Sequence, residues 1–153
     1  MPISYLHLPP GQEPPDFGEK RPYRAVVVVE QDTSPEWRAK VSDWLVQSGC
    51  LYMMAWGRDS SAWDDSVDWA NLIALGGADA LGGEDIPDDD FVMTTWHDHE
   101  PLSETFWFSQ HAAHHPTVPI DETIIIDVGP TERSAALVEM LKTNQTADDL
   151  NVP

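Results

Sequence analysis

The sequence has a single cysteine, Cys50, and few basic side chains. One cysteine cannot form an internal disulfide, which favours a reducing compartment or a protein indifferent to redox state, and we expect Cys50 to be a small core residue. Only 8 lysines and arginines stand against 27 acids, so the net charge is -19. A field of this sign repels nucleic-acid backbone and anionic membranes. We therefore expect neither as a partner, and consider solubility or a basic protein partner as the reason for the charge.

Long apolar runs are also missing. No stretch approaches the 18 apolar residues that indicate a membrane span, and the N-terminal segment MPISYLHLPPG has neither the basic region nor the apolar region of a signal peptide. The cytoplasm is the expected location.

Several well-defined catalytic and cofactor motifs are absent. There is no GxGxxG after the first apolar run, no GxxxxGK[ST], and no GxSxG. These absences argue against a dinucleotide site, a P-loop nucleotide site and an α/β-hydrolase. We expect no cofactor.

Apolar runs alternating with helical patterns make up most of the chain. Ala25–Val29 is apolar throughout, without the alternation of a half-exposed strand, and such a run is typical of a central parallel strand. The pattern predicts an α/β fold, three-layer and Rossmann-like or flavodoxin-like, with helices on both faces of a four-stranded, mainly parallel sheet in the order 2-1-3-4. The four expected strands contain Val26–Val29, Tyr52–Ala55, Val92–Thr95 and Ile124–Ile126.

Four helices are expected between and after these strands. Ser34 can cap the first, which Gly49 ends, and Asp65 can cap the second. The remaining boundaries come from prolines and apolar spacing: a second helix over about 66–75, a third from Pro101 to just before Pro116, and a last over about 132–142.

The chain is expected to form one domain with extended ends. Residues 1–24 contain six prolines and are read as a proline-rich, extended lead-in, which Ile3, Tyr5 and Leu6 can anchor to the body as an edge strand. Residues 25–143 form the α/β domain, and 144–153 form a loose tail. The glycine-rich and acidic stretch 76–90 is read as an exposed loop.

A functional site is expected where the strands end. In open α/β sheets ligands bind at the carboxyl ends of the strands. We predict a polar cluster of acids from the second helix with Arg58 and His97, flanked by tryptophans. The candidate catalytic residues are Asp64, Asp68, His97 and Asp98, and the candidate binding residues are Trp56, Arg58, Asp59, Trp63 and Trp96.

The seven tryptophans divide by position. Trp56, Trp63 and Trp96 lie at expected strand ends or in the loop that follows, where half-exposed side chains can anchor a partner. The other four fall on expected helices and are predicted to be core residues: Trp37, Trp44, Trp69 and Trp107.

Two histidines, His111 and His115, are one turn apart on the expected third helix. Such a pair can share a zinc ion, but the spacing matches no named metal motif. A helix C-terminus, where positive charge is favoured, explains the same residues. We therefore predict no metal site and keep His111 and His115 as the candidates if there is one.

The sequence resembles a family of small acidic bacterial proteins of uncharacterised function. The segments LYMMAWGRD, WDDSVDWANL, VMTTWH, ETFWF and HHPTV carry the resemblance, which covers most of the chain from Tyr23 to about Val128. It implies a bacterial source and one intact domain, and it lends no activity or site.

Two functions are compatible with these features. The first is a binding module, an immunity-like or antitoxin-like inhibitor of a basic partner, supported by the charge and the strand-end tryptophans. The second is a hydrolase or transferase acting on a small molecule through the Asp/His/Arg cluster, with or without a metal. Neighbouring genes would discriminate between them.

Overall fold

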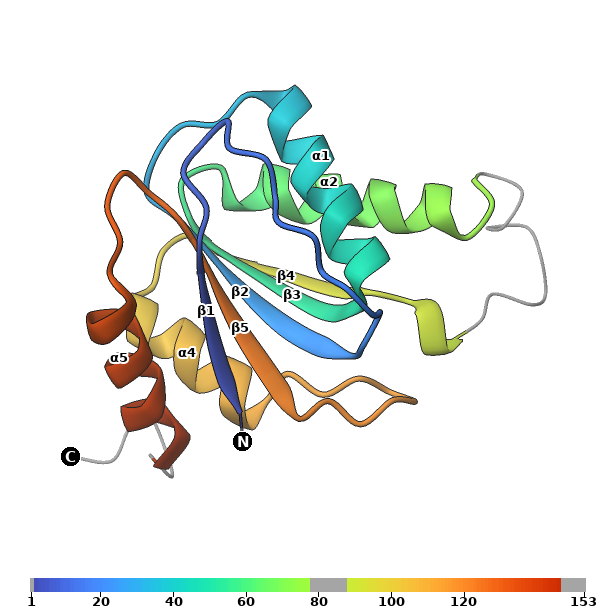
Figure 1. Cartoon of the computed structure of the whole chain (residues 1–153). Coiled ribbons are helices and arrows are strands. Elements are labelled where there is room, and N and C mark those ends of the chain that lie inside the picture. The colour runs from blue at the N-terminus through green and yellow to red at the C-terminus, as the bar shows by residue number, and fades with distance from the viewer. Residues whose placement is uncertain (1, 78–87, 147–153) are drawn as a thin grey trace.

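A parallel β-sheet of five strands forms the centre of the computed structural model, which describes residues 2–77 and 88–146 (Figure 1). The strands stand in the order β1-β5-β2-β3-β4, and every pair is parallel. Their bounds are β1 Ile3–His7, β2 Tyr23–Val29, β3 Cys50–Gly57, β4 Met93–His97 and β5 Glu122–Val128.

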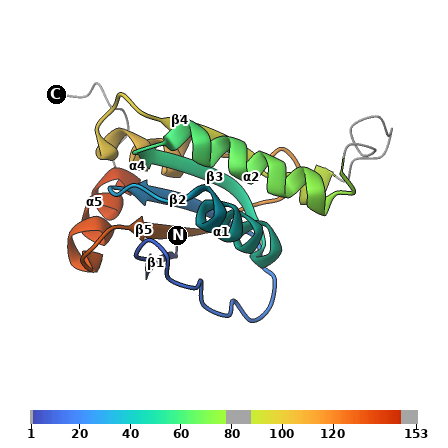
Figure 2. The same ribbon diagram turned by 90° about the horizontal axis from the view of Figure 1, so that it is seen from above.

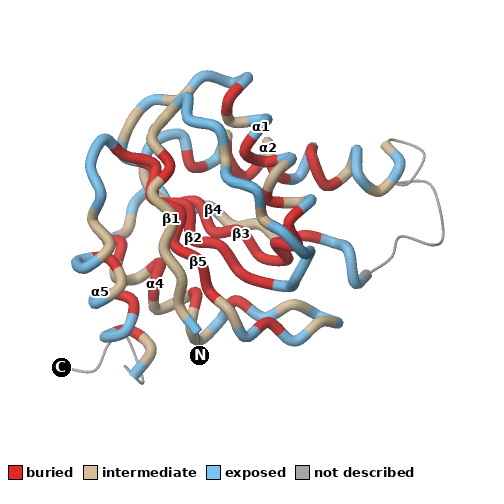
Figure 3. Tube along the Cα trace, viewed as in Figure 1, coloured by how far each residue is buried: buried red, intermediate tan, exposed pale blue. Residues whose placement is uncertain are grey.

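The central strand is β2, as predicted from its apolar run. All seven of its residues are buried, and Val27 lies between Ala55 of β3 and Ile126 of β5. Figure 3 shows the buried residues gathered along β2, β3 and β5, with exposed residues on the outer surfaces of the helices. The free energy of burying these aliphatic side chains is the main force that holds the layers together.

Helices cover both faces of the sheet, which confirms the predicted α/β class with four helices (Figures 1 and 2). α1 and α2 pack on one face against Val27 and Val29, and α4 and α5 pack on the other against Val26 and Val28. Their bounds are α1 Pro35–Ser48, α2 Ser60–Ala74, α4 Leu102–His111 and α5 Ser134–Thr146, and a 3-10 turn, η1, spans Asp88–Asp90.

The predicted strand count and strand order are wrong. The sheet has five strands rather than four, because Ile3–His7 pairs with β5 as an edge strand. The four expected strands stand in the order 3-2-1-4, not 2-1-3-4. From β2 to β4 the chain steps in one direction with α1 and α2 on the same face, and α4 then carries it back along the other face to β5 (Figure 1).

The lead-in is fastened to the body beyond β1. The indole Nε1 of Trp37 donates to the carbonyl of Gln12 at 2.8 Å, and that of Trp44 donates to the carbonyl of Pro15 at 2.7 Å. The segment between β1 and β2 therefore runs along α1 (Figure 1).

Several helix boundaries differ from the prediction. α2 begins at Ser60, about six residues earlier than expected, so Asp65 lies inside the helix and does not cap it. α4 ends at His111 rather than just before Pro116. α5 continues to Thr146, past its expected end at about residue 142. Most of the predicted loop and tail, residues 78–87 and 147–153, lies outside the described residues. No helix in the described ranges has the length and apolar character needed to cross a membrane.

Candidate functional site

The carboxyl ends of β2, β3 and β4 surround a groove of about 480 Å³. Parallel strands bring these ends to one edge of the sheet, where ligands bind in open α/β folds. Three predicted candidates, Trp56, Arg58 and Asp98, line the groove together with Glu30 and Glu100. The charged part of the lining thus consists of three acids and one cation, beside one aromatic ring.

A sharp turn after β3 sets the shape of this groove. Gly57 has a φ of 99°, and a Cβ atom there would stand 2.2 Å from the carbonyl oxygen of Val29, so the position requires glycine. Arg58 then turns toward the loop after β2, and its Nη1 lies 3.0 Å from Asp32 Oδ1. Asp59, also with a positive φ of 53°, precedes α2 and makes no side-chain cap bond.

His97 is held by a chain of polar contacts on the α4 side of the sheet. Its Nδ1 lies 2.9 Å from Glu100 Oε1, and its Nε2 lies 2.9 Å from the hydroxyl of Thr95. Its ring packs against Phe108 at 5.1 Å between centroids, and only 8% of His97 is exposed. Both ring nitrogens are thus engaged within the protein.

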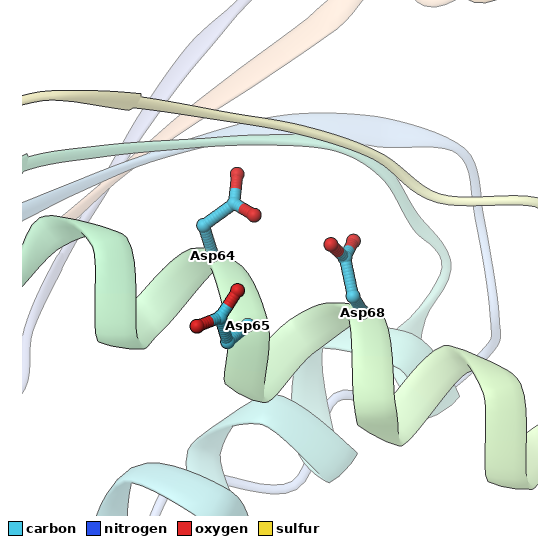
Figure 4. Close-up of side chains that lie close together, drawn as sticks. All are labelled: Asp64, Asp65 and Asp68. Atoms are coloured by element: carbon cyan, nitrogen blue, oxygen red, sulfur yellow. The ribbon is translucent and has the colours of Figure 1, made fainter.

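Asp64 and Asp68 lie on the opposite side, on α2, with their carboxylates directed toward the sheet (Figure 4). Asp68 Oδ1 accepts a hydrogen bond of 2.6 Å from the hydroxyl of Thr94 on β4. Asp64 is only 5% exposed, and its Oδ2 accepts no hydrogen bond from any described residue. Burial first, and then the neighbouring Asp68, raise the pKa of Asp64 to about 6.

The predicted cluster of Asp64 and Asp68 with Arg58 and His97 does not form. Side chains alternate along a strand, so Thr94 faces α2 whereas His97 faces α4, and the sheet separates the acids from the histidine. Arg58 is paired with Asp32 in the groove instead. The candidates thus fall into two places, the strand-end groove and the inner flank of α2.

The buried carboxylate of Asp64 predicts a specific pH dependence. Because the pKa is raised above its ordinary value of 3.8, the folded protein holds the proton more tightly than the unfolded chain. The stabilising effect of protonation is complete below about pH 4 and is lost as the pH rises through about 6. We expect the melting temperature of Asp64→Asn relative to the parent protein to rise between pH 4 and pH 7.5. A difference that stays constant with pH would contradict this. Asp43→Asn, at an exposed position on α1, is the control.

Trp63 is not the binding residue that was predicted. It is completely buried, and its ring meets Trp37 edge to face at 6.1 Å. The early start of α2 explains the difference, because it places Trp63 in the first turn facing α1 rather than in an open loop. Trp56 is half-buried and donates to the carbonyl of Glu100 at 2.8 Å, whereas Trp96 is 53% exposed, as expected for an anchor.

Sequence reasoning also missed exposed apolar side chains. Trp69, predicted to be core, is 64% exposed on α2. The spacing in the sequence could have indicated this exposure. Asp65, Trp69 and Ile73 stand at i, i+4 and i+8 and so share the outer side of the helix. Phe91, two residues before β4, is also exposed.

His111 and His115 do not form a pair. α4 ends at His111, so the expected helical spacing between them is lost. The Nε2 of His111 lies 2.7 Å from the carbonyl of Asn144, and the Nε2 of His115 lies 2.7 Å from the carbonyl of Phe91. Among the described residues, the one group of acids and histidines with the spacing to hold a metal ion is Asp64, Asp65 and Asp68.

Comparison with known proteins places this geometry in a family without assigning an activity. A family model described as "Domain of unknown function (DUF7684)" matches residues 3–144, from the first residue of β1 into α5. No curated protein and no solved structure matches the chain. The chain therefore belongs to the family of the domain of unknown function DUF7684.

Proposed function

We propose that this protein is a binding module whose α2/β4 face receives an extended basic segment of a partner protein, in the manner of an immunity or antitoxin protein. The α2/β4 face comprises Asp65, Asp68, Trp69 and Ile73 of α2 with Phe91 and Trp96 of the β4 segment. The function rests on one observation above all: the four large apolar side chains that stand exposed in the described residues all belong to this face.

These side chains come from two elements that lie side by side. Asn71 of α2 donates to the carbonyl of Asp90 at 3.0 Å and accepts from the amide of Val92 at 3.1 Å, so the helix is fixed along the strand that follows (Figure 2). Trp69 is 64% exposed and Trp96 is 53% exposed. Tryptophan is the side chain most enriched at binding hot spots, and two of them on adjacent elements support a binding face.

The charge of the face supports a basic occupant. Asp65 and Asp68 are exposed on α2, and Asp89 and Asp98 are exposed on either side of β4. None of these four is in an ion pair with a lysine or arginine of the described residues. The net charge of -19 adds a field that accelerates the approach of a basic protein.

The position of β4 supports an extended occupant. It is the last strand in the sheet order, and no strand of the described residues pairs with its outer edge. Addition of a partner strand to such an edge supplies backbone hydrogen bonds, while alternate side chains reach the flanking surface. Lysines or arginines at every second position of the added strand would then point to the α2 side of the sheet, toward Asp68 and Trp96, and the apolar residues between them would point to the α4 side.

The small-molecule hydrolase or transferase is favoured less, because its catalytic acids and its histidine lie on opposite faces of the sheet. The order 3-2-1-4 of β2 to β5 matches four of the six strands of the Rossmann order 3-2-1-4-5-6, and a Rossmann-like description of the three layers is part of this proposal. The chain lacks the glycine-rich phosphate loop, so a nucleotide is not part of it.

The proposal is tested by fluorescence anisotropy with a labelled peptide of alternating lysine and valine. We expect saturable binding that weakens as salt is raised, because the acids are exposed. Replacing both anchors, in Trp69→Ala/Trp96→Ala, should raise Kd at least about 30-fold, as loss of hot-spot side chains does. The two side chains are exposed, so the fold should be retained.

Two comparisons make the result specific. An equivalent peptide of glutamate and valine should not bind. Asp65→Asn/Asp68→Asn should weaken binding, whereas Asp43→Asn/Glu139→Gln, which removes the same charge from exposed sites on α1 and α5, should not. Equal affinity for all variants would mean that only net charge attracts the peptide, and the α2/β4 face would have no such role.

A further inference from the structure

The strongest unexplained feature outside the strand-end groove is the carboxylate of Asp64. A polar side chain removed from water costs free energy unless it is hydrogen-bonded, and an ionised one costs several kcal/mol unless it is paired. Asp64 is 5% exposed, its Oδ2 is unpartnered, and no lysine or arginine of the described residues is in an ion pair with it. Something else must neutralise this group whenever it is ionised.

Two further carboxylates stand beside it. One oxygen from each of Asp64, Asp65 and Asp68 lies within 4.8 Å of the others (Figure 4). The spacing i, i+1 and i+4 brings them to one turn of α2. Asp65 and Asp68 are exposed, so the group is open to solvent on one side and closed at Asp64 on the other.

The surroundings supply more oxygen atoms, and no lysine or arginine of the described residues is in an ion pair with these three acids. The hydroxyl of Thr94 donates to Asp68 Oδ1 at 2.6 Å, which fixes that carboxylate. Ser60, one helical turn before Asp64, is 2% exposed, and its hydroxyl is also without a partner among the described residues. The serine hydroxyl and Asp64 Oδ2, both without a partner among the described residues and one helical turn apart, point to an occupant with a hydration shell.

We propose that Asp64, Asp65 and Asp68 bind a hard, partly hydrated divalent cation on the inner flank of α2. Carboxylate oxygens are the ligands that Ca²⁺ and Mg²⁺ prefer, and both ions keep water at their remaining positions. Ca²⁺, with bonds of 2.3–2.6 Å, accommodates ligand oxygens up to about 5 Å apart, whereas Mg²⁺ requires them within about 4.2 Å. The site goes beyond the proposed function, although it shares Asp65 and Asp68 with the α2/β4 face.

Isothermal titration calorimetry of the full chain with CaCl₂ and with MgCl₂ at pH 7.5, in about 0.1 M KCl, tests the site. We expect one ion per chain with Kd of about 10⁻⁴–10⁻³ M, the weak end of the range for Ca²⁺ sites in proteins. Asp64→Asn/Asp65→Asn should weaken binding at least tenfold. Asp43→Asn/Glu139→Gln, which also removes two negative charges, should leave Kd unchanged.

Each result decides for or against the site. Because Asp64→Asn could alter the fold, Asp65→Asn alone, at an exposed position, provides the second variant and should weaken binding at least threefold. Absence of binding heat with both ions would overturn the proposed site. The same Kd in all variants would also overturn it, because the ions would then be attracted by the net charge alone. A negative result for the cation site would leave the proposed peptide binding standing, because that binding is measured without divalent cations.

Discussion

Replacing Arg133 by methionine should lower the free energy of unfolding by about 3–5 kcal/mol, the usual cost of removing one partner of a buried ion pair. Arg133 holds Asp127, which is completely buried at the end of β5. Its Nη2 donates to Asp127 Oδ1 at 2.5 Å and its Nε to Oδ2 at 3.2 Å, while its Nη1 donates to Glu30 at 2.8 Å. Without the guanidinium, Asp127 is left as an unpaired buried charge or must take a proton.

The network extends to the edge strand. The hydroxyl of Tyr5 on β1 donates to Asp127 Oδ2 at 2.5 Å and accepts from the amide of Arg133 at 2.9 Å. Burial and these bonds to Asp127 raise the pKa of Tyr5 to about 12, so the phenol remains a donor throughout the physiological range. One buried carboxylate thereby joins β1, β5 and the start of α5.

Urea denaturation measures this prediction, with Arg58→Met as the matched control. Arg58 also forms an ion pair, with Asp32, but both side chains are more than half exposed, so its loss should cost less than about 1 kcal/mol. The double variant Arg133→Met/Asp127→Leu should recover much of the lost stability, because it leaves no unpaired charge. Similar losses for Arg133→Met and Arg58→Met would contradict a special role for the buried pair.

Replacing Trp63 by alanine should also cost about 3–5 kcal/mol, as for other large-to-small changes of buried aromatic side chains. Trp63 is completely buried between α1 and the sheet, and its edge-to-face contact with Trp37 at 6.1 Å is lost together with the buried area. A cavity remains because the surrounding side chains relax only in part.

The comparison with Trp96→Ala makes this result informative. Trp96 is 53% exposed, so the same truncation there should change the free energy of unfolding by less than about 1 kcal/mol. If the two variants lost similar stability, either Trp63 would be less buried than described or Trp96 would be packed against something. Trp63→Ala should in turn alter peptide binding only through its effect on folding.

Local patterns were sufficient to predict most elements of the fold. The unbroken run at Ala25–Val29 indicated a strand buried on both faces, and Ser34 and Pro35 indicated the start of α1, where the Ser34 hydroxyl accepts from the amide of Trp37 at 3.1 Å. Both are decided by residues close in sequence. The strand order could not be predicted in this way, because it depends on which strand α4 returns to, and that is a long-range choice.

The prediction of one polar cluster was wrong for a local reason and for a long-range one. The start of α2 was placed after Asp65 because aspartate is a good cap, whereas the structure uses a glycine turn at Gly57 and the left-handed residue Asp59. The face to which each β4 side chain points follows from strand alternation once its register is known. That register separates His97 from Asp64, which no spacing in the sequence revealed.

The most direct test of the proposed α2/β4 face is an amide chemical-shift titration of the isotope-labelled protein with the lysine–valine peptide. We expect the largest shifts at residues 64–73 and 91–96, with broadening of the indole signals of Trp69 and Trp96 and little change in α5. If the peptide adds to the edge of β4 as a strand, it should also slow amide hydrogen exchange along Met93–His97. Shifts spread evenly over all acidic surfaces, α5 included, with unchanged exchange in β4, would contradict the account.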